Sequence, residues 1–139
     1  MARFVAQVAL RWTDQDVYRH VNHAKAVTLL EEARVAFVFE AAAADGVAGF
    51  PAGLLVVALH VEYRRQIPHR ADGLRVTMVI DELRAASFRI DYEMHDGPDA
   101  TDLVAVRAWT RMATYDLAAG RPRRMTPGER AFLGRWSAA

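Results

Sequence analysis

"AKAVTLLEEARVAFVFEAAAA", residues 24–44, contains no Gly or Pro and is rich in Ala, Leu and Glu, which are good helix formers. Apolar residues recur at the three- and four-residue spacing of a helix, at Ala26, Leu30, Ala33, Phe37, Ala41 and Ala44. A second apolar set occupies much of the remaining circumference: Val27, Leu29, Val35, Ala36, Val38 and Phe39. A helix that is apolar on nearly all sides is a buried helix. The rest of the chain is therefore expected to wrap around it.

Strand-like patterns flank this helix on both sides. Residues 3–12 alternate with period two before it. After the Gly- and Pro-containing loop "DGVAGFPAG", residues 45–53, four further segments read as strands: 54–66, 74–83, 87–95 and 102–116. Short links such as "HDGPDA" favour antiparallel pairing. The pattern predicts an α+β fold in which a five-stranded antiparallel sheet wraps a long central helix.

The chain end "TPGERAFLGRW", residues 126–136, predicts a short helix. Thr126 is expected to be its N-cap, Pro127 its first residue and Glu129 the partner of Thr126 in a capping box.

Length and composition set limits on the protein. Its 139 residues predict one domain over 1–139, and 53% hydrophobic residues provide for a sizeable core. A net charge of +1, from 18 basic and 17 acidic side chains, gives no global signature of nucleic-acid binding. Cysteine is absent, which excludes disulfide and thiol chemistry. The N-terminus alternates instead of forming a signal peptide, and Glu31, Glu32 and Arg34 interrupt the longest apolar run, so we expect a cytoplasmic protein without a membrane span.

The junction "DQDVYRHVNH", residues 14–23, concentrates ionisable groups just before the helix. Asp14, Asp16, His20 and His23 are plausible metal ligands, but their spacing matches no zinc pattern such as H-E-x-x-H, and we predict no metal. Capping is the simplest interpretation for Asn22, a good N-cap residue. An aspartate near a helix N-terminus is also favoured by the helix dipole.

A catalytic interpretation of the junction uses the same physics. A helix N-terminus offers free N–H groups that can stabilise a developing oxyanion. A carboxylate a few residues upstream could attack a carbonyl or activate water. The apolar helix could hold a hydrophobic acyl group, so the combination suits acyl-transfer chemistry.

The same residues carry a family resemblance. "RWTDQDVYRHVNHAKAVTLLEEAR", residues 11–34, resembles the opening of hot-dog-fold acyl-CoA thioesterases of the 4-hydroxybenzoyl-CoA thioesterase type, with their pattern R-x-x-D-x-D-x-x-G-H-V-N-N and a central helix ending near E-E-A-R. The resemblance continues through "LHVEYRRQIPHRADGLRV", "SFRIDYEM" and "VAVRAWTRMATYD" and covers nearly the whole chain. It implies a hot-dog fold, and a homodimer or homotetramer with the active site at the subunit interface.

The resemblance also implies roles for the junction residues. Asp16 matches the catalytic carboxylate, as nucleophile or general base, and His23 matches the position whose backbone N–H polarises the thioester carbonyl. Asp14, His20 and Asn22 match supporting positions. The implied activity is hydrolysis of an acyl- or aroyl-thioester of coenzyme A or acyl carrier protein, without a cofactor. Two positions depart from the pattern: Arg19 stands where Gly is usual, and His23 where a second Asn is common.

Cationic residues after the next strand are candidates for the coenzyme phosphates. "YRRQIPHR" supplies Arg64, Arg65, His69 and Arg70, which alternatively form a solvated basic loop. Glu31 and Glu32 are expected to pair with Arg34 rather than to act as catalytic acids. Trp109 falls on the outer parity of its strand, which favours self-association.

Two other functions suit this fold. A hydratase or dehydratase of acyl thioesters would recruit His20 or His23 with an acid, and a non-catalytic protein would bind acyl-CoA and leave it intact.

Overall fold

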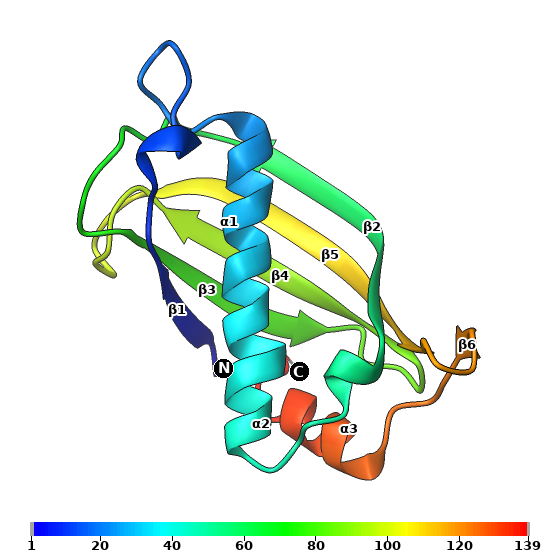
Figure 1. The fold of residues 1–139 in the computed structure, drawn as a ribbon. Coiled ribbons are helices and arrows are strands. Elements are labelled where there is room, and N and C mark those ends of the chain that lie inside the picture. Colours follow the sequence, from blue (N-terminus) through cyan, green and yellow to red (C-terminus); the bar gives the residue numbers. More distant parts are fainter. Residues whose placement is uncertain (1, 139) are drawn as a thin grey trace.

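A curved antiparallel sheet and one long helical segment dominate the computed structural model, which describes residues 2–138 (Figure 1). The strands are β1 (Phe4–Val8), β2 (Leu54–Tyr63), β3 (Leu74–Asp81), β4 (Ser87–His95), β5 (Val104–Asp116) and the two-residue β6 (Arg121–Pro122). The helices are α1 (His23–Val35), α2 (Ala42–Ala44) and α3 (Pro127–Gly134), with a π-helical turn η2 (Ala36–Ala41) and two 3₁₀ turns, η1 (Trp12–Asp14) and η3 (Phe50–Ala52). The predicted α+β hot-dog architecture is confirmed.

The strand order is β1-β3-β4-β5-β2, and every pairing is antiparallel. The short links correctly indicated that β3, β4 and β5 are neighbours. β2 does not pair with β3, however, because residues 64–73 form a connection too long for a tight hairpin. It pairs with β5 instead and forms an edge of the sheet.

The first strand ends earlier than its sequence pattern predicts. Val8 pairs with Leu74, the first residue of β3, so no partner strand remains for the residues that follow. The chain turns instead into the 3₁₀ turn η1, which leads to the junction.

The predicted helix over 24–44 is present, from His23 to Ala44, but its middle is π-helical. In this turn the N–H of Ala42 donates to the carbonyl of Phe37, five residues earlier. The helix crosses one face of the sheet (Figure 1). Its buried residues belong to one hydrophobic core with residues of the strands: Ala26, Leu29, Leu30, Ala33, Phe37, Val38 and Ala42. The opposite side carries the exposed Glu31, Glu32 and Glu40. Within one chain, the sheet therefore covers one side of the helix and leaves the glutamate side exposed.

The terminal helix α3 begins as predicted. Thr126 is the N-cap, its hydroxyl accepts from the N–H of Glu129 at 3.1 Å, and the Glu129 carboxylate accepts from the N–H of Thr126 at 2.8 Å. Glu129 is buried and bound by both terminal nitrogens of Arg123, at 2.7 and 2.8 Å. Burial raises the pKa of Glu129, but the hydrogen bonds from Arg123 and Thr126 outweigh that effect and lower it.

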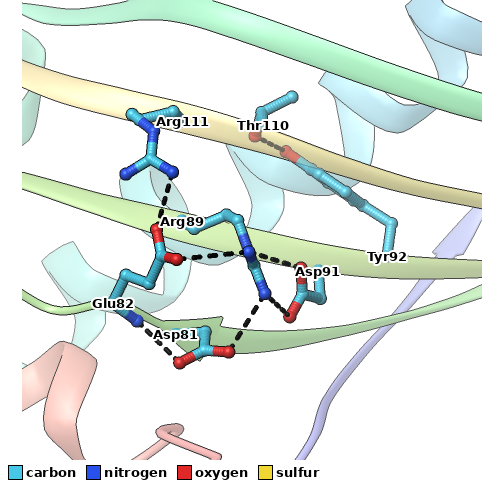
Figure 2. Close-up of polar contacts among 7 residues, drawn as sticks. All are labelled: Asp81, Glu82, Arg89, Asp91, Tyr92, Thr110 and Arg111. Carbon is cyan, nitrogen blue, oxygen red and sulfur yellow. Dashed lines mark hydrogen bonds and ion pairs between the residues drawn. The ribbon is translucent and has the colours of Figure 1, made fainter.

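The outer face of the sheet carries a cluster of ion pairs centred on Arg89 (Figure 2). Arg89 bonds Asp91 at 2.9 Å and Asp81 at 3.1 Å, and Glu82 joins it to Arg111. Trp109 lies on this face, as its parity predicted, stacked on His60 with ring centroids 5.8 Å apart. Among residues 2–138, none of the helices is both long and apolar enough to cross a membrane.

Candidate active site

The junction folds into a tight hairpin between β1 and α1. Gln15 and Val21 form an antiparallel bridge, and the N–H of Asp16 donates to the carbonyl of His20 at 2.9 Å. The turn closes through the N–H of Arg19, which donates to the carbonyl of Asp16 at 2.9 Å. Asp16 thus sits at the base of the hairpin, held by the backbone on both sides.

Arg19 occupies the left-handed region of backbone space, with φ of 64°. A three-residue hairpin turn commonly ends with a residue in this conformation, and Gly adopts it without a steric penalty. This backbone requirement is a physical reason for the Gly in the family pattern. The exposed Arg19 meets the requirement at an energetic cost.

Asp14 anchors the hairpin and is only 1% exposed. Its carboxylate accepts from the backbone N–H of Arg11 at 2.7 Å and from the Arg11 guanidinium at 3.1 Å. Burial raises the pKa of Asp14, but these hydrogen bonds outweigh burial and hold the pKa below its usual value. Its carbonyl also accepts from the N–H of Asn22 at 2.9 Å. Asp14 therefore ties the start of the hairpin to the start of the helix.

Asp16 is half-buried and far less constrained. One carboxylate oxygen accepts from the backbone N–H of Tyr18 at 2.9 Å. Within residues 2–138 this is the only hydrogen bond of that carboxylate, so its second oxygen is free to contact a ligand.

The N-terminus of α1 lies beside the hairpin. Asn22 is the N-cap, as predicted, and its side-chain oxygen accepts from the N–H of Ala24 at 2.9 Å. His23 is the first helical residue, so its N–H has no intrahelical acceptor. The hydroxyl of Tyr63, at the end of β2, donates to the His23 carbonyl at 2.9 Å. This bond fixes the edge of the sheet against the helix start.

Asp16 and His23 line one cavity of about 220 Å³, which we call the Asp16 cavity. Ala26, Ile67 and Val106 give it an apolar floor, and its other lining residues are Tyr18, His20, Val21, Tyr63, Arg65 and Gln66. The Nδ1 atom of His20 is buried with no hydrogen-bond partner among the described residues. A carboxylate, a helix N-terminus and an apolar surface therefore meet in one place.

The predicted basic residues separate into two pairs. Arg65 lines the Asp16 cavity. His69 lines a second, open hollow that shares Asp16 with this cavity. There the His69 ring is edge-on to Trp12, with ring centroids 5.7 Å apart. Arg64 bonds Glu62 at 3.3 Å, and Arg70 bonds both carboxylate oxygens of Asp72 at 2.5 and 2.9 Å. Neither of these two arginines lines the Asp16 cavity.

Sequence reasoning missed several residues of the cavity. Tyr63 shares the inward parity of Leu59 and Val61, so an inward-facing tyrosine at the strand end was a usable signal. Gln66 and Ile67 lie in an irregular connection without periodicity, which offered no such signal. No cluster of three or more possible metal ligands occurs in the part of the chain that the structure describes.

Comparison with known proteins places these features in a family. The thioesterase-like superfamily matches residues 10–133. A comparison with curated proteins finds no match.

Several solved structures share the fold. A protein from Bacillus stearothermophilus described as a predicted thioesterase is 19% identical, with a TM-score of 0.78 over 98% of this chain and 97% of that one. The 1,4-dihydroxy-2-naphthoyl-CoA thioesterase from Synechocystis is 16% identical, with a TM-score of 0.76 over 96% of each chain. The dynemicin thioesterase is 15% identical, with a TM-score of 0.83 over 99% of each chain.

These structural likenesses establish the fold, and the superfamily match extends over most of the sequence. The predicted enzyme class, thioester hydrolase, is confirmed at the level of the family. The chain belongs to the thioesterase-like superfamily.

Proposed function

We propose that this protein hydrolyses an acyl- or aroyl-CoA thioester with Asp16 as its catalytic carboxylate. The observation that carries the proposal is the shared cavity, in which Asp16 and the first residue of α1 lie together over an apolar floor. Thioesterase relatives of the same fold, one named for a CoA thioester, support the substrate class.

In the proposed reaction the thioester carbonyl lies between Asp16 and the start of α1. The N–H of His23 donates to the carbonyl oxygen and stabilises the negative charge that develops there. Asp16 either attacks the carbonyl carbon, so that the C–S bond breaks and water then hydrolyses the resulting anhydride, or removes a proton from the attacking water. In both routes the coenzyme leaves as its thiol and the acyl group as a carboxylic acid.

The remaining junction residues have supporting roles in this proposal. Asp14 and Asn22 hold the hairpin against the helix through the hydrogen bonds described above. His20 lines the cavity with an unpartnered ring nitrogen and can orient a polar group of the substrate. In this proposal Arg65 and His69, which line the two hollows that share Asp16, contact the coenzyme phosphates, and Arg64 and Arg70 are more distant cations.

We also propose that residues 1–139 form a single hot-dog domain that assembles as a homodimer or homotetramer. Among residues 2–138, β2 pairs only with β5 and its other edge has no partner strand, and Leu55, Val57 and Leu59 of β2 are exposed. An apolar edge strand of this kind readily pairs with another chain.

Val57→Lys in β2 is expected to shift the molecular mass measured by light scattering toward that of the monomer. A monomeric wild-type protein at micromolar concentration would contradict the assembly.

The test of function is thiol release from a panel of acyl- and aroyl-CoA thioesters. Hydrolysis of at least one, with a pre-steady-state burst if Asp16 is the nucleophile, is the expected result. Acyl-CoA that binds and stays intact over hours would instead indicate a binding protein. Conversion of enoyl- to hydroxyacyl-CoA without thiol release would indicate a hydratase.

A further inference from the structure

A second cavity, of about 150 Å³, lies further along α1 and is lined by Arg34; we call it the Arg34 cavity. Its walls come from the helix, through Val27, Thr28, Glu31 and Arg34, and from the sheet, through Val56, Leu59 and Thr110. The Asp16 cavity lies between the same elements, nearer the helix N-terminus.

The pairing of β2 with β5 shows how the two cavities are arranged along the sheet. Tyr63 pairs with Val106 in the Asp16 cavity, and Leu59 pairs with Thr110 in the Arg34 cavity. The intervening pair on the same face is Val61 with the small Ala108. The apolar side chains of Val61 and Ala108 therefore lie between the two cavities, and we call this stretch between α1 and β2, from Asp16 to Arg34, the track.

The far end of this track is polar and buried. The hydroxyls of Tyr92 and Thr110, whose residues are 2% and 1% exposed, are hydrogen-bonded at 2.7 Å (Figure 2). Arg34 donates to the Tyr92 hydroxyl at 3.3 Å. Burial raises the pKa of Tyr92 despite the opposing charge of Arg34, so the phenol stays protonated and can donate to Thr110. The Thr110 hydroxyl can then donate its own proton to a ligand.

The guanidinium of Arg34 has N–H groups available for a ligand. Its side chain is 12% exposed, and within residues 2–138 its hydrogen bonds are those to Tyr92 and to Glu31, both at 3.3 Å. Glu31 is 63% exposed in its side chain, so this predicted pair is a weak surface contact. A guanidinium carries more N–H donors than these two bonds use, and its planar fork matches a carboxylate.

We propose that the track binds an acyl chain that ends in a carboxylate, held by Arg34 and Thr110. This inference rests on the proposed function, since it places the thioester carbonyl between Asp16 and His23. His23 and Arg34 are about 16 Å apart along the helix axis, and helical side chains lean toward the N-terminus, which shortens the span. The acyl chain must therefore be long enough to cross Val61 and Ala108.

The experiment compares thiol release from length-matched substrates: hexanoyl- with adipoyl-CoA, octanoyl- with suberoyl-CoA, and decanoyl- with sebacoyl-CoA. We expect the wild-type protein to prefer the dicarboxylic member in at least one pair by about tenfold or more in kcat/KM, since hydrogen bonds to charged groups are the strong ones. Arg34→Met should abolish the preference, and Glu31→Gln should increase it by removing a competing charge. Arg124→Met, on an exposed segment outside both cavities, is the matched control and should keep the wild-type ratio.

Arg34→Lys provides a second variant if Arg34→Met does not fold, as judged by circular dichroism. It keeps the charge but not the planar fork, so the preference should fall. A wild-type protein that prefers the plain acyl chain at every length, or an unchanged ratio in Arg34→Met or Arg34→Lys, would overturn the proposal.

Binding of non-hydrolysable thioether analogues of the same pairs separates the two proposals. If no thioester is cleaved, the proposed hydrolysis fails, but tighter binding of the carboxylate analogue, lost in the Arg34 variants, would still support the carboxylate site. Equal binding of both analogues would overturn it.

Discussion

Replacement of Asp16 by Asn separates catalysis from folding more cleanly than any other substitution in the hairpin. Within residues 2–138 the carboxylate accepts one hydrogen bond, from the N–H of Tyr18, and the amide oxygen of Asn can keep it. The other oxygen has no hydrogen-bond partner to lose among the residues that the structure describes, so stability should change by less than about 1 kcal/mol. The amide can neither attack a thioester well nor accept a proton from water.

The expected loss in kcat for Asp16→Asn is roughly 10²–10⁴-fold, the usual contribution of a general base. This corresponds to about 2.7–5.4 kcal/mol of activation free energy. The assay is thiol release by the purified variant, with melting temperature and circular dichroism measured in parallel. A nucleophilic role would give the larger loss and remove any burst of product.

Asp14→Asn is the matched control, because it makes the same chemical change two residues away. Asp14 accepts two hydrogen bonds from Arg11 and is buried, so its replacement should lower stability more than Asp16→Asn and turnover less. Near-wild-type turnover in Asp16→Asn would refute the catalytic role and leave Asp16 as a hairpin residue only.

Three further outcomes follow from the same geometry. Asp14, whose pKa is lowered in the folded state, stabilises the fold in its ionised form above about pH 4, and this contribution should disappear as pH falls through the folded-state pKa. The free energies of unfolding of wild type and Asp14→Asn, measured by urea titration, should therefore converge in acid. A constant difference between them across the pH range would contradict this role of Asp14. Arg19→Gly should raise stability by about 1 kcal/mol by relieving the left-handed backbone, whereas a lower melting temperature would show that the side chain makes a compensating contact. Arg65→Ala should raise KM more than it lowers kcat, with a larger effect in low salt, because Arg65 lines the Asp16 cavity and its ion pair with Asp96 is long, at 3.8 Å. Arg64→Ala should do less, because Arg64 lies outside that cavity and bonds Glu62 at 3.3 Å; equal effects would contradict this distinction.

The sequence predicted the elements well where periodicity was strong. The apolar spacing over 24–44 gave the long helix, and Thr126 with Glu129 gave the capping box of α3. It could not show that β2 pairs with β5, because pairing between strands so far apart in the sequence depends on how the whole sheet closes on the helix. The π-helical turn also escaped prediction, since its residues have ordinary helical side chains.

The structure brings the predicted junction residues Asp16 and His23 into one cavity, whereas the predicted basic residues after β2 separate. The positions of Asp16, Asn22 and His23 followed from one short motif next to a helix start, where local geometry decides the outcome. Arg64 and Arg70 were equally good phosphate candidates by residue type, but they bond Glu62 and Asp72 outside the Asp16 cavity. Arg65 lines that cavity, and its ion pair with Asp96 is longer, at 3.8 Å. Such competition depends on side-chain placement, which residue type does not specify.

The π-helical turn at Ala36–Ala41 also affects how this chain should be aligned with its relatives. A π turn accommodates one residue more than an α-helix that follows the same path. One residue could therefore be deleted between 36 and 41 while the hairpin end of α1 and the connection after Ala44 keep their positions. A relative with a regular helix here would match this chain only with a gap inside the helix, a place where alignments are normally kept free of gaps. In such an alignment, the residues of this chain after the turn should be shifted by one position relative to the residues before it.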